Sequence, residues 1–413
     1  MVPNGWKLTS LGDISSKIQT GPFGSQLHAH EYTDEGIPVL MPKDLIDGRA
    51  DINSAAKIPE TRADDLVKHK LKKGDILFSR RGDVARFGLI TEESEGALCG
   101  TGCLKASISK ENSALFLSYF LQKSTVRKWL EQNAVGQTML NLNTTILSEL
   151  PIMVASSKQE QQKIANILAT WDKAISATER LIENSTQQKK ALMQQLLTGK
   201  KRLLDDNGKR FEGEWEEVNL SKVVKVTGGN AFKSAEFIKA GVPLVKISNI
   251  KPDYSVNVDT SVFVEYSQKH NRFEIKRGDI LIAMSGATTG KVGKYEFDEL
   301  AYLNQRVGRF DVKKSIIKDY LFQLLKLPKI QHNILIDAVG GAQPNISNKD
   351  IERIKVSLPS LEEQQKISTV LTNADKEIDL LEQQLADLQQ EKKALMQVLL
   401  TGKKRVVVEE ETL

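Results

Sequence analysis

The feature that most constrains this chain is a long internal repeat. Residues 160–202 return as residues 363–405, displaced by 203 positions without a gap; the shared stretches read Glu-Gln-Gln-Lys-Ile, Lys-Lys-Ala-Leu-Met-Gln and Leu-Leu-Thr-Gly-Lys-Lys-Arg. A match of this length does not arise by chance, so one unit stands twice in the chain. The two copies are expected to adopt the same fold.

The segments upstream of these stretches repeat more weakly and need small insertions to align. Trp6 corresponds to Trp215, Gly-Ile-Pro-Val-Leu at Gly36 corresponds to Gly-Val-Pro-Leu-Val at Gly241, and both copies contain Gly-Asp-Ile-Leu. Each copy is therefore a diverged globular part followed by a well-preserved segment. We expect a first globular domain at 1–155, a helical region at 156–200, a linker at 201–213, a second globular domain at 214–358, a helical region at 359–402 and a tail at 403–413.

The preserved segments have the heptad pattern of coiled-coil helices. Apolar side chains recur at alternating steps of four and three residues, and neither Gly nor Pro interrupts them. Gly199 and Gly402 follow the last apolar positions and are expected to end the helices. The seam residues are Ile164, Leu168, Trp171, Ile175, Ile182, Leu192 and Leu196 in the first helix, and Ile367, Leu371, Ile378, Leu381, Leu385, Leu388, Leu395 and Leu399 in the second.

Two such helices in one chain are expected to pair with each other. Antiparallel pairing places one globular domain at each end, related by a pseudo-two-fold axis, and needs only the short connection at 200–213. Residues 156–212 include 11 basic and 7 acidic side chains, whereas residues 359–413 include 7 basic and 11 acidic ones, which favours side-by-side packing. The sequence predicts two homologous domains joined by an antiparallel coiled coil.

The globular domains are expected to be of the α/β or α+β class. Apolar runs at 76–79, 243–247 and 280–283 predict buried strands, and residues 114–132 and 320–337 have helical periodicity. Hydrophobic residues make up 40% and charged residues 27% of the chain, a balance that supports more than one core and excludes a disordered chain.

The sequence offers no convincing catalytic motif. Residues 286–292 resemble a phosphate-binding loop, but the spacing is one residue short and no Ser or Thr follows Lys291; a hairpin loop is favoured instead. Asp253 with Glu274 and Lys276 matches a loose nuclease pattern that the other copy lacks. The two cysteines and five scattered histidines predict neither a disulfide framework nor a metal site. We expect no catalysis by the chain alone and no cofactor or metal bound by it.

Targeting signals are also missing. The sequence contains no run of 18 apolar residues and no signal-peptide pattern, so we expect a cytoplasmic protein without a membrane partner.

With these motifs in place, the chain resembles the specificity subunit of a type I restriction-modification system. The resemblance covers almost the whole chain and is carried by the paired Glu-Gln-Gln-Lys-Ile and Leu-Leu-Thr-Gly-Lys-Lys-Arg segments, by Trp6 and Trp215, and by the Gly-x-Pro and Gly-Asp-Ile-Leu strands. It implies two target-recognition domains that each read half of a bipartite, asymmetric DNA site, with helices that set the spacing between the halves.

The resemblance also implies partners. Two modification subunits would dock on the helices and methylate adenine with S-adenosylmethionine, and two restriction subunits would use ATP and Mg²⁺. The chain itself would bind double-stranded DNA and catalyse nothing.

The candidate DNA contacts are loop residues whose side chains bind phosphates or base edges. An arginine at 80 or 81 could bind guanine with two hydrogen bonds, and the amide side chains could bind adenine in the same way. The candidates are Ser25, Lys43, Arg80, Arg81, Gln137 and Asn141 in the first domain, and Lys233, Lys246, Ser285, Thr288, Thr289, Lys291, Gln343 and Asn345 in the second.

Two other functions stay open on the sequence alone. A structural coiled-coil adaptor that binds proteins would explain the helices, but not why its two ends are homologous and yet diverged. A standalone nuclease or methyltransferase is the other alternative, and it would cleave or methylate DNA without partner subunits.

Overall fold

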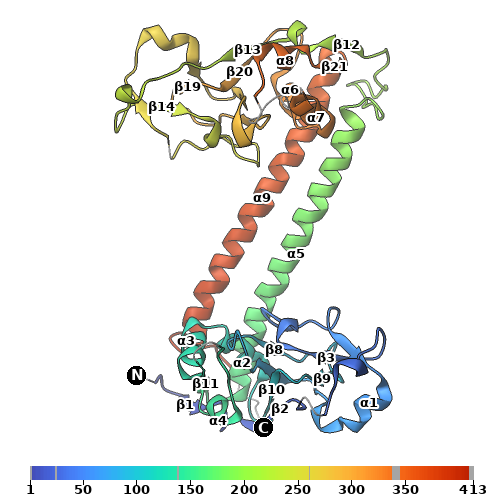
Figure 1. Ribbon diagram of the computed structural model, residues 1–413, viewed down its shortest axis with the longest axis vertical. Helices are drawn as coiled ribbons and strands as arrows, with labels where there is room; N and C mark the ends of the chain where they lie inside the picture. The colour runs from blue at the N-terminus through green and yellow to red at the C-terminus, as the bar shows by residue number, and fades with distance from the viewer. Residues whose placement is uncertain (1, 24–25, 137–138, 260, 337–344, 409–413) are drawn as a thin grey trace. The chain divides into compact units, whose positions relative to one another are not determined.

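The computed structural model describes residues 2–23, 26–136, 139–259, 261–336 and 345–408. The chain divides into two compact units, one formed by residues 1–179 and 384–413 and the other by residues 180–383. Each unit contains one globular domain and about half of each long helix, α5 (Lys158–Leu196) and α9 (Leu361–Leu399) (Figure 1). The domain limits expected from the sequence stay a prediction, because this division passes through the helices.

The first globular domain is built on a six-stranded sheet with the order β2-β10-β7-β8-β5-β4. A three-stranded sheet, β6-β3-β9, and the antiparallel pair β1 with β11 complete it. The strands are β1 (Trp6–Ser10), β2 (Ser15–Thr20), β3 (Ile37–Leu40), β4 (Leu45–Ile46), β5 (Gly48–Ala50), β6 (Ala56–Ile58), β7 (Asp75–Ser79), β8 (Phe87–Leu89), β9 (Leu98–Cys99), β10 (Cys103–Ile108) and β11 (Pro151–Ala155).

The second globular domain repeats this plan with sheets β13-β20-β17-β18, β15-β14-β19-β16 and β12-β21. Its parallel pair β14 with β19 corresponds to β3 with β9 in the first domain. The strands are β12 (Glu216–Asn219), β13 (Val224–Gly228), β14 (Val242–Val245), β15 (Phe263–Val264), β16 (Glu274–Ile275), β17 (Ile280–Ala283), β18 (Val292–Lys294), β19 (Ala301–Leu303), β20 (Val307–Val312) and β21 (Lys355–Leu358). The predicted class and the tandem duplication are confirmed.

Each long helical pattern of the globular domains is in fact two helices. The bounds are α2 (Ala114–Leu121), α3 (Ser124–Asn133), α6 (Lys318–Leu325) and α7 (Pro328–Ile336); the shorter helices are α1 (Glu60–Asp65), α4 (Thr144–Ser148) and α8 (Asn348–Arg353). Pro328 has no N–H to continue α6 and restricts Leu327 before it. In the first domain, Lys123 N–H donates to the Phe120 carbonyl at 3.2 Å, a tight turn that ends α2. Residue 337, the predicted end of the second pattern, lies outside the described residues.

The halves of α5 and α9 pair antiparallel in each unit, as the heptads predict. In the first unit, Arg405, beyond the end of α9, donates to both carboxylate oxygens of Glu160 at the start of α5, at 2.6 and 2.7 Å. In the second unit, Arg202 and Glu363 repeat this pair at 2.6 and 2.7 Å. All the predicted seam residues are buried or half-buried.

The two predicted helix ends explain the repeated tryptophans. Gly199 and Gly402 have φ of +70° and +65°, the left-handed conformation that commonly ends a helix and that glycine adopts most easily. A Cβ on Gly402 would lie 2.9 Å from the Trp6 ring, and one on Gly199 would lie 3.3 Å from the Trp215 ring. In each unit, therefore, the tryptophan packs on the glycine that ends a long helix.

Candidate nucleic-acid interface

In the first unit, backbone hydrogen bonds join three loops, two of which carry candidate DNA contacts. Arg80 N–H donates to the Gly102 carbonyl at 2.8 Å, and Leu142 N–H donates to the Arg80 carbonyl at 2.9 Å. Arg81 and Asn141 form an isolated β-bridge beside them. We call residues 80–82, 101–102 and 141–142 the first strip.

The first strip presents an arginine beside an asparagine. Arg81 is exposed, Arg80 is half-buried, and the Ser79 hydroxyl donates to the Arg81 carbonyl at 2.9 Å, which holds the loop in place. Asn141 is half-buried, and its Oδ1 has no hydrogen-bond partner among the described residues. The exposed guanidinium donors of Arg81 are suited to hydrogen bonding with base edges, and they lie beside an amide oxygen that is buried without a partner among the described residues.

The second unit contains the same framework with different side chains. Met284 N–H donates to the Arg306 carbonyl at 2.9 Å, and Ile346 N–H donates to the Met284 carbonyl at 2.9 Å. Ser285 and Asn345 form the β-bridge that Arg81 and Asn141 form in the first unit. We call residues 284–286, 305–306 and 345–346 the second strip.

Arg306 is a member of the second strip that the candidate set omits. Its side chain is exposed, and Nη1 donates to Asn345 Oδ1 at 3.3 Å. Its location in the three-residue turn between β19 and β20 is the signal that could have found it, because β20, which follows the turn, is a neighbour of β17 in the sheet.

Two candidate lysines lie in turns that adjoin the strips. Lys43 is exposed on the 3-10 turn at Pro42–Asp44, and a Cβ on Gly102 of the first strip would lie 2.9 Å from Pro42 Cδ. Lys246 is half-buried before the corresponding turn of the second unit, Ile247–Asn249, and its ammonium group lies 5.3 Å from the centre of the Phe237 ring. A Cβ on Gly286 of the second strip would lie 3.6 Å from Ile247 Cδ1 in that turn. The structure therefore brings Lys43 and the first strip together, and Lys246 and the second strip.

The remaining candidates are placed less favourably. The loop that resembled a phosphate-binding loop is the turn of the β17–β18 hairpin, where Thr289 is 8% exposed and its hydroxyl donates to the Gly286 carbonyl at 2.7 Å. The Thr288 hydroxyl is buried without a partner in the part of the chain that is described, and Lys291 is half-buried. Lys233 is exposed in a separate turn.

Three further candidates, Ser25, Gln137 and Gln343, lie outside the described residues.

The residues of the tested enzyme motif have other partners. Asp253 accepts hydrogen bonds from the backbone N–H and the hydroxyl of Ser255 at 3.0 and 2.7 Å, and Glu274 pairs with Lys276 at 3.5 Å. Within the described ranges, no group of three or more His, Cys, Asp or Glu side chains is placed to hold a metal ion. Cys99 and Cys103 are free and buried, and burial raises the pKa of the Cys99 thiol to about 12, so it stays protonated.

No helix in the described parts of the chain has both the length and the apolar composition needed to cross a membrane.

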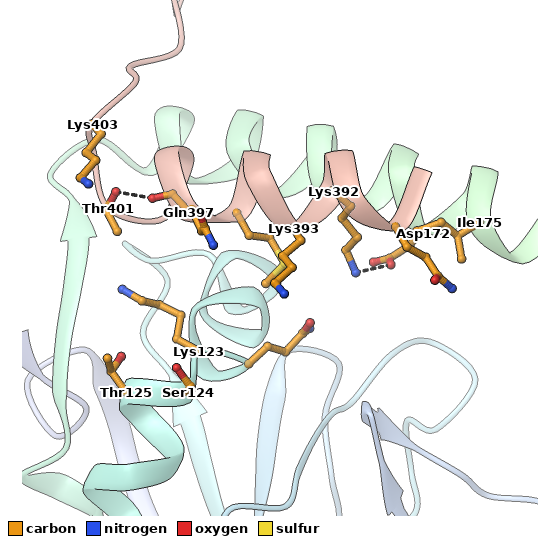
Figure 2. A pocket seen from close by; sticks show the side chains of 13 residues that line it. Lys123, Ser124, Thr125, Asp172, Ile175, Lys392, Lys393, Gln397, Thr401 and Lys403 are labelled. Atoms are coloured by element: carbon orange, nitrogen blue, oxygen red, sulfur yellow. Dashed lines mark hydrogen bonds and ion pairs between the residues drawn. The ribbon is translucent and has the colours of Figure 1, made fainter. Parts of the chain in front are cut away.

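The first unit also contains a cavity of about 770 Å³ between the α2–α3 turn and α9, which we call the helix groove (Figure 2). Figure 2 shows Lys392 reaching Asp172 across one wall, with Lys123, Ser124 and Thr125 on the other. Burial lowers the pKa of Lys123. The walls also include Ile175, Met396, Lys393 and Lys403, so the groove combines an apolar lining with cationic groups.

Comparison with known proteins identifies the family. The family model described as the type I restriction modification DNA specificity domain matches residues 3–185 and again residues 212–390. The chain belongs to this family. It is a DNA sequence-specificity subunit with two target-recognition domains, and it is a non-catalytic part of a type I restriction-modification enzyme, as the resemblance predicts.

Individual relatives agree over nearly the whole chain. The chain is 29% identical to the type I restriction enzyme MjaVIII specificity subunit of Methanocaldococcus jannaschii, over 98% of this chain and 94% of that protein. It is 22% identical to the EcoKI specificity subunit of Escherichia coli K12, over 89% of this chain and 81% of that protein.

Two solved structures share the fold. The type I restriction-modification S subunit from M. genitalium superposes with a TM-score of 0.62 at 19% identity and 97% coverage of both chains. The HsdS subunit from Thermoanaerobacter tengcongensis superposes with a TM-score of 0.51 at 16% identity and 98% coverage of both chains.

Proposed function

We propose that the first and second strips each read one half of a bipartite, asymmetric DNA sequence. The observation that carries this proposal is that both units hold three loops together by the same two backbone hydrogen bonds but place different side chains on them. A shared framework with Arg81 in one unit and Ser285 at the bridged position of the other suits two readers of different bases. The antiparallel helices then set the spacing between the half-sites.

The same proposal assigns the preserved helices to partner subunits. Lys190, Ala191 and Gln194 are exposed, and so are their exact repeats Lys393, Ala394 and Gln397. Packing within the chain does not account for identity at exposed positions, whereas docking of two identical modification subunits does. The cationic groups of the helix groove favour an acidic segment of that subunit.

In this assembly the chemistry belongs to the partners. The modification subunits use S-adenosylmethionine to methylate adenine, two restriction subunits use ATP and Mg²⁺, and the complex acts on DNA in the cytoplasm.

The test is to reconstitute the chain with its modification subunits and to map methylated adenines on DNA of many sequences. The parent complex is expected to give one bipartite motif with a constant gap. Substituting Arg81 by Ala should relax one half of the motif only, by about 5- to 150-fold at one base, the range of about 1–3 kcal/mol per bidentate contact. The same change at Arg80 tests which arginine makes the contact.

One control and two contrary outcomes complete the test. Arg353→Ala removes another exposed arginine, at the end of α8 and outside both strips, and should leave the motif unchanged. A complex that selects no DNA sequence would support the alternative of a structural adaptor. Methylation or cleavage of DNA by the isolated chain would contradict the assignment of catalysis to the partner subunits.

A further inference from the structure

A strained residue marks the second strip. Arg306 has φ of +70°, the left-handed region in which the Cβ of an L-residue crowds its own following carbonyl. Apart from glycines, only Asp47 and Tyr254 share a positive φ within the described residues. Glycine adopts this conformation without strain, so an arginine kept there suggests that its side chain has a function.

The backbone of Arg306 is fixed, while its side chain projects from the surface. Its carbonyl accepts from Met284 N–H at 2.9 Å, and the turn is closed by Val307 N–H, which donates to the Asn304 carbonyl at 3.1 Å. The only hydrogen bond of its guanidinium group to a described residue is the 3.3 Å contact with Asn345.

Three other arginines of the same domain form ion pairs with carboxylates, whereas Arg272 lies over the Phe273 ring. Arg277 pairs with Asp298 at 2.8 Å, Arg309 with Asp311 at 2.7 Å, and Arg353 with Asp350 at 3.9 Å. Arg306 has no such ion pair within the ranges that the structure describes. Its charge and most of its donors therefore remain available to a ligand.

The first unit places its exposed arginine on a different segment. The position corresponding to Arg306 is Gly102, where a Cβ would lie 2.9 Å from Pro42 Cδ, so a larger residue there would force the turn to move. The exposed arginine of the first strip is Arg81, and the residue bridged at the same place in the second strip is Ser285. Each strip thus has an exposed arginine next to an asparagine, Asn141 or Asn345, but supplied from different loops.

We infer that Arg306 is a specificity-determining residue of the second target-recognition domain and that it reads a guanine. The planar guanidinium group would donate to guanine O6 and N7, the bidentate pair that distinguishes this base in the major groove. Asn345 acts as its positioning residue, because its amide oxygen orients the guanidinium group. The inference rests on the proposed reading of DNA by the strips.

The experiment uses the whole complex of the chain with its modification subunits. Adenine-methylation motifs are mapped for the parent, Arg306→Gly, Arg306→Lys and the control Arg353→Ala. Glycine keeps the backbone conformation of the turn while removing the side chain. Arg306→Gly is expected to lose discrimination at one guanine of one half-site by about 5- to 150-fold, Arg306→Lys by less, and Arg353→Ala not at all.

A modified base then tests the contact itself. Replacing that guanine by 7-deazaguanine, which lacks the N7 acceptor, should weaken binding of the parent and leave the binding of Arg306→Gly unchanged. Asn345→Ala should weaken reading of the same guanine in the parent but have no further effect in Arg306→Gly, since a purely structural role would weaken both.

Three outcomes would overturn the inference: an unchanged motif in Arg306→Gly, a loss of affinity that is equal for all sequences, as for a phosphate contact, or relaxation at a base other than guanine. Failure of the proposed function is distinguishable, because the parent complex would then show no bipartite motif at all.

Discussion

Asp172 and Asp375 occupy the same position in the two copies of the helical segment, yet their surroundings differ. Each forms an ion pair with the repeated lysine of the facing helix, Lys392 for Asp172 and Lys189 for Asp375. From the globular domains, Asp172 accepts from the Tyr119 hydroxyl at 2.5 Å, whereas Asp375 accepts from the Gln323 amide at 2.6 Å. The helices have kept their mutual contacts while the residues that pack on them have changed.

The largest difference at these two sites is a buried lysine. In the second unit, Lys326 lies 3.4 Å from Asp375 and 4.1 Å from the centre of the Phe322 ring. Lys326 directly follows α6, and the equivalent residue directly after α2 in the first unit is Gln122, which is exposed and lines the helix groove. Two identical docking partners would therefore meet the same residues at the exposed repeated positions of the helices but different flanking walls.

The repeated arginine–glutamate pairs give the sharpest test of this comparison. Glu363 is fully buried and the Arg202 side chain is 19% exposed, whereas the Arg405 side chain that pairs with Glu160 is 47% exposed. Arg202→Ala leaves a buried carboxylate unpaired and should lower the free energy of unfolding by about 3–5 kcal/mol. Glu160 is itself only 2% exposed, but the Arg405 side chain that covers it is about half exposed, so its removal opens Glu160 to water. Arg405→Ala should therefore lower the free energy of unfolding by only about 1–3 kcal/mol.

Urea denaturation of both variants measures this difference, with exposed Arg210→Ala as a control that should be neutral. Equal losses in the free energy of unfolding for Arg202→Ala and Arg405→Ala would show that the difference in burial has no effect on stability.

The buried lysine predicts a pH dependence of stability in the second unit, at a position where the first unit has the uncharged Gln122. Burial lowers the pKa of Lys326 to about 8 from its ordinary value of 10.5, against the opposing effect of Asp375. Between these two pKa values the lysine is protonated in the unfolded chain but not in the folded one, so the free energy of unfolding rises with pH across this window. Below pH 8 the lysine is protonated in both states, and the folded state is destabilised by a constant amount. The penalty is at most about 3 kcal/mol.

Lys326→Met removes this ionisation. Its gain in stability over the parent, measured by denaturation at several pH values, should be largest at pH 8 and below and should shrink towards pH 10.5. Lys329→Met, which removes an exposed lysine of α7, should show no such trend. A gain that does not change with pH would contradict the assignment.

Substitution of the two glycines that end the long helices should give the smallest difference in stability between the two units. Alanine in the left-handed conformation loses about 1–2 kcal/mol at either site. In Gly402→Ala the new Cβ would also approach the Trp6 ring to 2.9 Å, compared with 3.3 Å from Trp215 in Gly199→Ala, so Gly402→Ala should be the less stable variant. Gly208 has φ of +76°, and a Cβ built on it would have no atom within 4 Å. Thermal unfolding of Gly208→Ala therefore measures the cost of the left-handed conformation without any steric contact.

The sequence by itself determined the duplication and the presence of two long helices that pair. These are visible because a heptad seam is a local pattern and because an ungapped repeat places equivalent residues at one constant displacement. The Glu-Gln-Gln-Lys-Ile motif could be identified as repeated but not explained: in the structure Gln161 accepts from Ser113 N–H at 2.8 Å and Gln364 accepts from Ile317 N–H at 3.0 Å, contacts across about 48 residues.

Only the tertiary structure decided which loops form the strips. Residues 80–82, 101–102 and 141–142 are far apart along the chain, and they meet because β7 and β10 are neighbours in one sheet while the segment before α4 bonds to the loop after β7. The sequence selected Arg81 and Asn345 by residue type and by position in a loop, and on the same grounds it included the buried Thr289. Those grounds did not distinguish Arg306 from the other basic loop residues of the second domain, so it was not among the candidates. Backbone conformation and burial depend on contacts between distant segments, which residue type and spacing do not encode.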